Sequence, residues 1–280
     1  MNRVVVVTGS SSGIGLATAL SFARAGDAVV ATVRDPAGAD DLRAAVAEAE
    51  VGVEVMGLDV TDDDAVAHVM GDILARHGRV DVLVNNAGAP FTATLEELPI
   101  SEFHRSMDVN FFGVVRTTKA VLPAMRVAGG GHLIAVTSLG GVVGQPFNDA
   151  YCAAKFAVEG LYESLHPVAA AFGVRVSIVE PGPVDTRFDE KAVPVDAEAA
   201  APFATLRARY RELMDSGSAR RQPPADVGDL IVGIADEDRP VLRYQTGKLV
   251  SRIAAMKLAD MTGERITALT ATWLAAPPAT

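Results

Sequence analysis

Short apolar runs alternate with longer segments of helical periodicity over the first 180 residues of the chain. The first run, Val4–Val7, is β-branched and ends in a turn of glycine and serine, and the segment 13–25 that follows has helical spacing. The same alternation predicts strands at Ala28–Val33, Val53–Leu58, Val80–Val84, Leu133–Thr137 and Val174–Val179, and helices at 39–50, 62–77, 101–127 and 149–172. This alternation is typical of βαβ units, so it predicts an α/β fold: a Rossmann-type, doubly wound parallel sheet with helices on both faces.

The pattern changes after residue 183. Residues 184–224 are mixed and contain several prolines, residues 225–236 look helical, Val241–Tyr244 predicts a seventh strand, and 247–275 predicts a helical extension. Because no linker separates a second domain, we expect a single domain over 1–280, with 184–224 as a helical lid over the substrate. Pro167 lies inside the predicted helix 149–172, where it removes one hydrogen bond, so we expect a kink there.

Charge and composition exclude several classes of protein. The net charge of −10 argues against a nucleic-acid partner. Cys152 is the one cysteine, which rules out a disulfide framework and predicts a reducing, cytoplasmic location. There is no apolar run long enough for a membrane span, no targeting peptide before the first strand, and no metal-ligand spacing among the histidines, so we expect no metal.

The glycine-rich stretch TGSSSGIG, residues 8–15, lies between the first strand and the first helix. Gly9 permits a tight turn, Gly13 lets the backbone approach a phosphate, and Gly15 permits close packing of helix and strand. A helix N-terminus offers free N–H groups to a pyrophosphate. We therefore predict a dinucleotide site; the alternative is an ordinary flexible turn. The residues assigned to it here are Gly9, Ser11, Ser12, Gly13 and Ile14.

The end of the second strand, ATVRD, indicates which dinucleotide binds. NAD-binding proteins usually carry an acidic residue there, which holds the ribose hydroxyls. Val33 occupies that position in this chain, and Arg34 follows it. An arginine suits a 2′-phosphate, so we predict NADP(H) in preference to NAD(H). The alternative is a surface arginine paired with Asp35.

The stretch YCAAK places Tyr151 and Lys155 four residues apart on one face of a predicted helix. A lysine ammonium stabilises phenolate and lowers the pKa of a neighbouring tyrosine, which would make the phenol a better proton donor. The alternative is a helix that happens to carry both residues.

Together these motifs and several others, in order and spacing, identify a family. The motifs are Thr8-Gly9-x-x-x-Gly13-Ile14-Gly15, Asp59-Val60, Asn85-Asn86-Ala87-Gly88, Asn110, Ser138, Tyr151-x-x-x-Lys155 and Pro181-Gly182. Over residues 3–190 the chain resembles the short-chain dehydrogenases/reductases. The stretches GQPFNDAYCAAKFAVEGLYESL and RYQT resemble the branch that contains 17β-hydroxysteroid and retinol dehydrogenases.

The resemblance implies an enzyme that interconverts a ketone or aldehyde and the alcohol on a lipophilic small molecule. It implies that Tyr151 is the general acid and base, that Lys155 also holds the nicotinamide ribose, that Ser138 orients the carbonyl, and that Asn110 anchors a water. The further cofactor residues that it implies are Asp59 and Val60 at the adenine, Asn86, Ala87 and Gly88 near the adenine ribose, and Thr186 toward the nicotinamide. Pro181, Gly182 and Val184 complete the set. It also implies a homodimer or homotetramer.

Two other functions stay open at this stage: a sensor or scaffold that binds NADP(H) without turnover, and a non-redox lyase or epimerase on the same fold. The substrate stays open as well. A set of apolar and aromatic residues could line a substrate pocket or form the inner face of a lid helix. They are Val142, Val143, Phe147, Phe188, Val193, Phe203, Leu206, Tyr210 and Met214.

Overall fold

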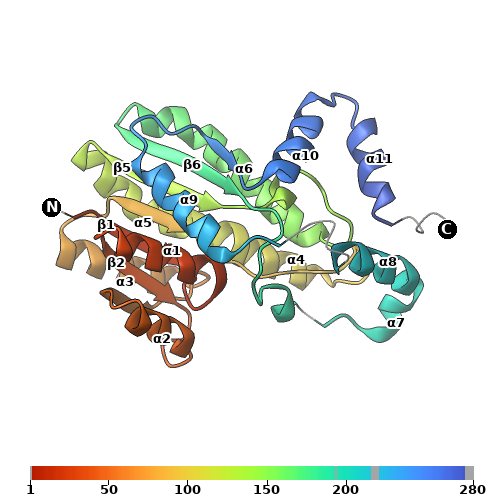
Figure 1. Ribbon diagram of the computed structural model, residues 1–280, viewed down its shortest axis with the longest axis horizontal. Helices are drawn as coiled ribbons and strands as arrows, with labels where there is room; N and C mark the ends of the chain where they lie inside the picture. Colours follow the sequence, from red (N-terminus) through yellow and green to blue (C-terminus); the bar gives the residue numbers. More distant parts are fainter. Residues whose placement is uncertain (1, 193, 216–220, 275–280) are drawn as a thin grey trace.

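A seven-stranded parallel sheet forms the core, in the order β3-β2-β1-β4-β5-β6-β7 (Figure 1). The computed structural model describes residues 2–192, 194–215 and 221–274. The strands are β1 (Val4–Thr8), β2 (Ala28–Val33), β3 (Val53–Gly57), β4 (Val82–Asn85), β5 (Gly131–Val136), β6 (Val174–Glu180) and β7 (Arg243–Gln245). The order reverses between β1 and β4, which confirms the predicted doubly wound sheet and places its switch point there.

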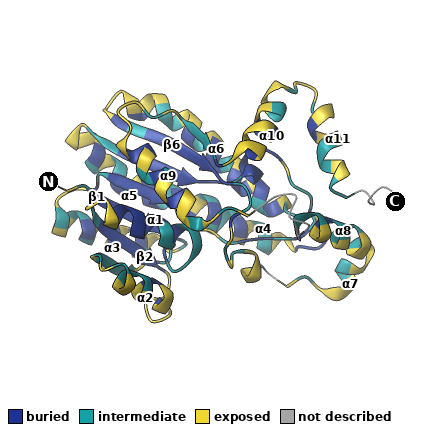
Figure 2. Cartoon of the chain, viewed as in Figure 1, coloured by how far each residue is buried: buried dark blue, intermediate teal, exposed yellow. Residues whose placement is uncertain are grey.

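Two layers of helices cover the sheet. One face packs against α3 (Asp63–His77), α5 (Gly113–Ala128) and α6 (Asp149–Ala170), and the other against α1 (Gly13–Arg24), α2 (Asp40–Glu48) and α9 (Pro224–Asp236). Successive strand residues point to opposite faces, so Val6 packs in the first layer while Val5 and Val7 pack in the second. Because both faces are covered, the five inner strands β2, β1, β4, β5 and β6 are nearly continuous runs of buried residues, most of them apolar, whereas the edge strands β3 and β7 are only partly buried (Figure 2).

The predicted long helix over 101–127 is interrupted. It consists of α4 (Ile100–Met107), a π-helical segment (Asp108–Phe112) and α5. A π turn closes i→i+5 bonds and so accommodates one residue more than an α turn, and such turns occur frequently at functional sites. Asn110 lies in the middle of this segment and is fully buried.

Helix α6 runs through Pro167 to Ala170 as one continuous helix, so the proline does not end it, and the kink expected there stays a prediction. Proline removes one backbone bond of the helix, but the flanking turns are held by packing. Tyr162 lies on one side of it and Ala169 on the other, and both side chains are buried in the core between α6 and the sheet. Only the last turn of the helix follows the proline.

Between β6 and α9 the chain forms short helical pieces, among them a 3-10 turn (Asp189–Lys191), α7 (Ala197–Ala200) and α8 (Ala204–Asp215). Arg207 fixes α8 to the body of the protein. Its guanidinium pairs with the buried carboxylate of Glu97, donates to the carbonyl of Thr92 at 3.3 Å, and lies 4.7 Å from the centre of the Phe147 ring. The segment is thus attached beside the loop that precedes α4.

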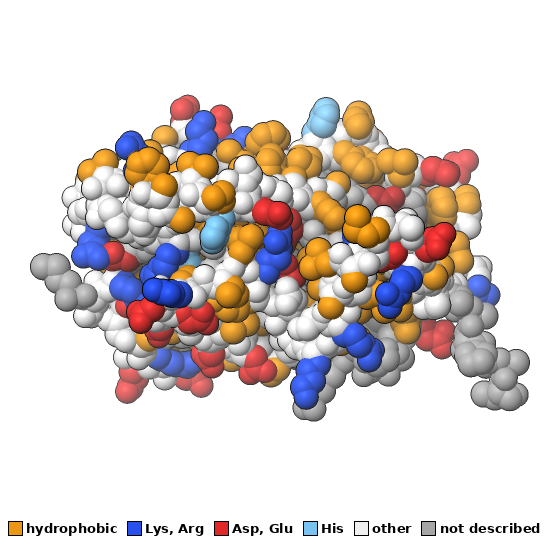
Figure 3. Space-filling model, turned by 90° about the horizontal axis from the view of Figure 1, so that it is seen from above, with side chains coloured by type: hydrophobic (Ala, Val, Ile, Leu, Met, Phe, Trp, Pro, Cys, Tyr) orange, Lys and Arg blue, Asp and Glu red, His pale blue; other side chains and the backbone are white. Residues whose placement is uncertain are grey.

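The predicted C-terminal extension forms two helices, α10 (Lys248–Ala259) and α11 (Glu264–Thr272); its last residue, 275, lies outside the described residues. Both pack on the loop after β5, in a cluster that includes Val142 and Val143. Hydrophobic side chains also gather on the outer surface at this end of the molecule (Figure 3), where Leu258 is 69% and Met261 94% exposed. Among the residues that the structure describes, no helix has the length and apolar character needed to cross a membrane.

Candidate active site

The ends of β1 and β4 are tied together at the switch point of the sheet. The hydroxyl oxygen of Thr8 accepts bonds from the N–H groups of Asn86 and Ala87, both at 3.0 Å. The side-chain amide of Asn86 donates back to the carbonyls of Thr8 at 2.9 Å and Gly9 at 3.1 Å. The glycine-rich loop and the Asn-Asn-Ala-Gly stretch therefore form one rigid unit.

The glycines of this loop stand where no side chain fits. Gly9 has φ +70°, and a Cβ there would lie 2.7 Å from the Cα of Ala87. A Cβ on Gly15 would lie 2.4 Å from the Nδ2 of Asn86 and 2.4 Å from the carbonyl oxygen of Gly9. Ser12, the N-cap of α1, makes no side-chain capping bond, so the first N–H groups of α1 stay open toward the loop. The arrangement is a backbone cradle suited to a phosphate.

Arg34 lies exposed at the carboxyl end of β2, close enough to Asp59, which follows β3, for its charge to act on that carboxylate. Val33 is buried in the core, so Arg34 is the first side chain of this strand end that faces solvent. Asp35 does not pair with it: its carboxylate accepts from the N–H of Ala37 at 2.9 Å, and no described residue forms an ion pair with Arg34. The alternative of an Arg34–Asp35 pair is therefore not observed.

Asp59 is held ionised beside Arg34. Burial opposes ionisation, but bonds from the N–H and hydroxyl of Thr61, at 2.9 and 2.7 Å, together with the charges of Arg34 and Arg116, lower the pKa of Asp59. Val60, the next residue, packs against Gly113 so closely that a Cβ on that glycine would lie 2.8 Å from it. This pair thus borders the cradle on the side of β3.

Ser138 and the face of α6 that carries Tyr151 and Lys155 meet at the carboxyl end of β5. Ser138 caps the turn after the strand by accepting from the N–H of Gly140 at 3.0 Å, and its hydroxyl hydrogen-bonds Tyr151. The Nζ of Lys155 lies 5.7 Å from the centre of the Tyr151 ring and donates to the carbonyl of Val136 at 3.0 Å. The structure thus brings together three of the four predicted catalytic residues directly.

Burial is the largest influence on the pKa values of Tyr151 and Lys155. It raises the pKa of Tyr151, and the hydrogen bond with Ser138 only partly opposes this. It lowers the pKa of Lys155 to about 8, against the opposing charge of Glu159. The predicted lowering of the Tyr151 pKa is therefore wrong: loss of hydration decides the direction, and the Lys155 ammonium donates to the carbonyl of Val136.

Asn110, the fourth predicted residue, reaches the site through the backbone. Its Oδ1 accepts from the N–H of Ala89 at 3.0 Å, while its Nδ2 donates to the Ala89 carbonyl at 3.1 Å and lies 3.4 Å from the hydroxyl of Ser106. A Cβ on Gly88 would lie 2.8 Å from the Oδ1 of Asn110 and 3.7 Å from the Nζ of Lys155. Asn110 therefore fixes the backbone that borders Lys155.

The loop after β6 closes the cradle from the other side. The carbonyl of Pro181 accepts from the N–H of Leu139 at 2.8 Å, and Gly182 donates to the hydroxyl of Thr246 at 3.1 Å. Val184, also buried, forms a bridge to Gln222. Thr186 accepts from the N–H of Phe188 at 3.3 Å, and its methyl group would lie 3.0 Å from a Cβ on Gly13.

Lys191 is a residue of the cradle that sequence reasoning missed. Its Nζ lies 3.3 Å from the hydroxyl of Ser12, which places a cation from the β6–α9 segment over the glycine-rich loop. Charge patterning offered no signal, since the contact joins residues 179 positions apart. The lysine adds a positive charge to a site that already carries the open N–H groups of α1.

Phe188 packs against the ring of Tyr151, and Phe147 and Tyr210 form a second aromatic pair. The rings of Phe188 and Tyr151 meet edge-on with their centres 6.0 Å apart. The ring centres of Phe147 and Tyr210 lie 5.6 Å apart, and the hydroxyl of Tyr210 lies 3.4 Å from the Nδ2 of Asn148. Of the apolar residues predicted for the pocket, Val142 and Val143 pack against α10 and α11 instead, and Val193 lies outside the described residues.

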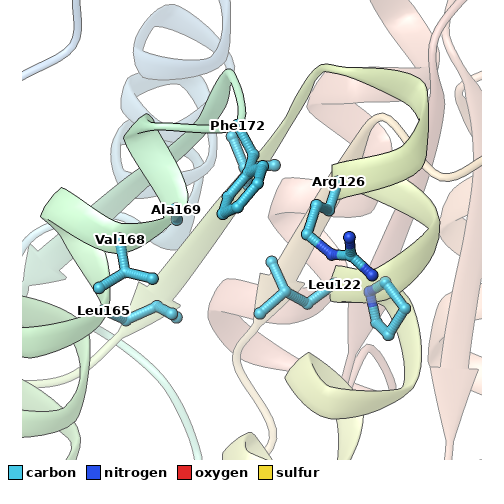
Figure 4. A pocket seen from close by; sticks show the side chains of 8 residues that line it. Leu122, Arg126, Leu165, Val168, Ala169 and Phe172 are labelled. Carbon is cyan, nitrogen blue, oxygen red and sulfur yellow. The ribbon is translucent and has the colours of Figure 1, made fainter.

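A separate apolar groove runs between α5 and α6 (Figure 4). It is lined by Leu122, Pro123, Arg126, Leu165, Val168, Ala169, Phe172 and Val174. Leu165 follows Tyr151 by fourteen residues, about 21 Å along the helix. This α5–α6 groove is thus remote from the candidate active site.

The sheet order, the glycine cradle and the Ser-Tyr-Lys grouping define a nicotinamide-dependent Rossmann enzyme. The family model described as short chain dehydrogenase matches residues 3–196, and the chain belongs to that family. The predicted membership is thereby confirmed, and the protein is an oxidoreductase.

Two human proteins place the chain within the family. Retinol dehydrogenase 8 from Homo sapiens is 40% identical over 274 residues, covering 93% of this chain and 86% of its own length. The 17-beta-hydroxysteroid dehydrogenase type 1 from Homo sapiens is 38% identical over 271 residues, covering 93% and 82%. These similarities confirm the predicted resemblance to the branch of steroid and retinol dehydrogenases.

Solved structures share the fold. A short-chain dehydrogenase from Streptomyces avermitilis superposes with a TM-score of 0.83 at 35% identity, covering 97% of this chain and 96% of the other. An alcohol dehydrogenase from the archaeon Thermococcus sibiricus, complexed with 5-hydroxy-NADP, superposes with a TM-score of 0.73 at 27% identity, covering 88% and 96%.

Proposed function

We propose that the protein is an NADP(H)-dependent oxidoreductase that interconverts a ketone or aldehyde and the alcohol on a lipophilic small molecule. The observation that carries the proposal is the meeting of Ser138, Tyr151 and Lys155 beside the glycine cradle, at one edge of the sheet. Proton transfer and dinucleotide binding would then occur at the same place.

The residues of the cradle fit a dinucleotide. The N–H groups at the start of α1, with Lys191, would hold the pyrophosphate, and Asp59 and Val60 would border the adenine. Arg34 would hold the 2′-phosphate; its exposure and its freedom from Asp35 support NADP(H), as does the 5-hydroxy-NADP bound by the Thermococcus enzyme. When bound, the nicotinamide would supply or accept the hydride.

The chain's own residues would move the proton. Tyr151 is protonated at neutral pH, so the phenol carries the proton that a carbonyl oxygen would take up during reduction. Its raised pKa makes it a weaker acid, which the side chain of Ser138 partly offsets. The Ser138 hydroxyl would orient that carbonyl. Lys155 gives one N–H to Val136 among the described residues and keeps two for the ribose hydroxyls, while Asn110 holds the adjoining Gly88–Ala89 backbone.

The decisive variant is Tyr151→Phe, which removes the proton donor and keeps the ring. We expect NADPH affinity to stay within about twofold, while turnover falls about 10²–10⁴-fold, as for loss of a general acid. NADPH absorbance would be followed over a panel of lipophilic ketones and aldehydes. Tyr162→Phe is the matched control, because it removes another buried hydroxyl from the same helix, one bonded to Asn85 and Thr118 and not to the site.

Three outcomes would count against the proposal. Full activity in Tyr151→Phe would remove the tyrosine from the mechanism. Tight NADPH binding without turnover on any member of the panel would favour the sensor or scaffold. Conversion of substrate with no net change in NADPH would favour the lyase or epimerase.

The substrate, the lid and the assembly are part of the same proposal. The ring of Phe188 beside Tyr151, and the apolar alcohols in the names of the relatives, support a lipophilic substrate. Residues 184–224 would form the lid over it.

The α5–α6 groove, where Phe172 is 47% exposed, supports a homodimer or homotetramer, which light scattering would test. The cytoplasmic location stays a prediction from the single cysteine.

A further inference from the structure

A buried cluster of charges lies directly beneath the candidate active site. Glu159, on α6 one turn after Lys155, is 6% exposed. Its Oε1 accepts from the hydroxyl of Thr137 at 2.6 Å, and its Oε2 accepts from the Nε of Arg243 at 3.1 Å. A buried carboxylate is costly unless it is paired and hydrogen-bonded, and here both oxygens are engaged.

The cluster contains a second buried carboxylate that shares the same arginine. Glu180 is fully buried on β6; it lies 3.4 Å from the Nε of Arg243 and accepts from the side chain of Gln245 at 2.8 Å. The guanidinium of Arg243 also reaches Glu163 at 2.5 Å, near the surface. The guanidinium of Arg243 therefore forms ion pairs with three carboxylates. Lys155, on α6, is the other cation close to Glu159.

Glu159 joins the elements that carry the reacting groups. Thr137 immediately precedes Ser138, and its hydroxyl lies 3.1 Å from the carbonyl of Val179 on β6. Arg243 belongs to β7, while Glu159 shares α6 with Tyr151 and Lys155. A Cβ on Gly141, in the turn after Ser138, would lie 3.2 Å from the Glu159 carboxylate. The carboxylate of Glu159 thus joins α6, the start of β7 and the segment that leads from the end of β5 to the Ser138 turn.

We propose that Glu159 is a positioning residue for the reaction, which supplies a negative charge one helical turn from Lys155 and holds the strand end that carries Ser138. This inference rests on the proposed function. Four ionisable groups surround the carboxylate: Lys155 and Glu163 from α6, Glu180 from β6 and Arg243 from β7. Of these four groups only Lys155 belongs to the site, so the charge of Glu159 acts on the reaction through Lys155, while its bond to Thr137 acts on the strand end that carries Ser138.

The electrostatics give the direction of the effect. Burial raises the pKa of Glu159 to about 7, with Thr137 and Arg243 opposing and Glu180 adding to the rise. Above pH 7 the carboxylate is therefore ionised, and its charge raises the pKa of Lys155, which burial has lowered to about 8. The two groups titrate close together, so loss of the carboxylate would lower the pH at which Lys155 loses its proton.

Glu159→Gln tests this, because glutamine keeps the size and an acceptor oxygen and removes the charge. NADPH affinity and kcat/KM would be measured from pH 6 to pH 10 in the full-length protein. In the wild type we expect both to fall as the pH rises through about 8, where Lys155 becomes neutral. We call this fall the alkaline limb of the pH profile. In the variant we expect the midpoint of the alkaline limb to lie about one pH unit lower, a size that follows from Coulomb's law at the effective dielectric constant of a protein.

Glu163→Gln is the matched control, since it removes the other α6 partner of Arg243, whose side chain is 64% exposed, and we expect it to leave the limb in place. Thr137→Val keeps the shape of the side chain and removes a bond that favours the carboxylate, so it should move the limb the same way by less. It also keeps the test open if Glu159→Gln does not fold.

Some results would overturn the proposal for Glu159, and others would overturn the proposed function of the protein. A limb that stays in place in folded Glu159→Gln, or moves equally in Glu163→Gln, would make Glu159 a structural residue only. With Thr137→Val as the only folded variant, an unmoved limb would have the same meaning. A wild-type protein that neither binds NADPH nor turns over would instead sink the proposed function itself.

Discussion

His132 makes the stability of this protein depend on pH in a way that can be worked out from the structure. The ring is fully buried on β5, and its Nε2 lies 2.9 Å from the hydroxyl of Ser177, which in turn donates to the carbonyl of Val241 at 3.0 Å. Nδ1 is buried with no hydrogen-bond partner among the described residues. An imidazolium there would be dehydrated, so burial lowers the pKa of His132 to about 3, and the charges of Arg175 and Arg3 act in the same direction.

The sign of the effect follows from comparing the folded with the unfolded chain. The unfolded histidine takes up a proton near pH 6.5, and the folded one only near pH 3, so the stability due to His132 is complete above pH 6.5 and is lost progressively below it. At pH 5 the loss amounts to about 2 kcal/mol relative to pH 7, at 1.36 kcal/mol per pKa unit. Glu159 acts in the opposite direction, because its raised pKa makes the folded chain hold a proton between pH 7 and 4.5.

The comparison that isolates His132 is therefore between two proteins. His132→Gln keeps a donor for Ser177 and cannot titrate, while Glu159 contributes equally to both proteins. Urea unfolding followed by circular dichroism at pH 7 and pH 5 gives four free energies of unfolding. We expect the loss between pH 7 and pH 5 to be about 2 kcal/mol larger in the wild type than in the variant. Losses that agree within about 0.5 kcal/mol would refute the reasoning.

Two further predictions concern the cradle. Gly15→Ala places a methyl group 2.4 Å from the Gly9 carbonyl and the Asn86 amide, so we expect a loss of about 1–3 kcal/mol in unfolding free energy and of NADPH binding, measured by urea titration and fluorescence; normal binding would show that the loop can move aside. Arg34→Ala removes the contact to the 2′-phosphate, so we expect NADPH affinity to fall about 10–100-fold while NADH affinity stays unchanged. Equal losses for both cofactors would mean that Arg34 acts on the fold.

The inner strands of the sheet could be predicted closely because they are buried on both faces and therefore appear as short apolar runs rich in β-branched residues. β2 has the predicted bounds Ala28–Val33, and β1 extends the predicted Val4–Val7 by one residue. The start of β4 was placed two residues early, at Val80, because an apolar residue just before a strand has the same character as one inside it. The local pattern of apolar residues is therefore sufficient to place a strand when all of its residues are buried.

The site was only partly predictable, since several of its features arise from contacts distant in sequence. The π-helical segment depends on the bonds between Asn110 and Ala89, and the sequence DVNFF shows no break in helical spacing. The pKa of Tyr151 was assigned from its nearest charge, whereas burial, which no spacing reveals, decides its direction. The contact of Lys191 with Ser12 depends on how the β6–α9 segment folds back.

The π-helical segment also determines how this region can change in length. A residue deleted between Asp108 and Phe112 would let the backbone return to ordinary α-helical bonding without breaking the rod, so the helix itself would tolerate the loss. The helices α4 and α5 would keep nearly the same relative orientation, because the π turn takes up the extra residue within one turn. Ser106 on α4 would therefore keep its bond to the carbonyl of Ala150, at 3.0 Å, at the start of α6. What such a deletion would change is the place of Asn110, whose side chain holds the backbone of Ala89, so we expect insertions and deletions among relatives to avoid this turn.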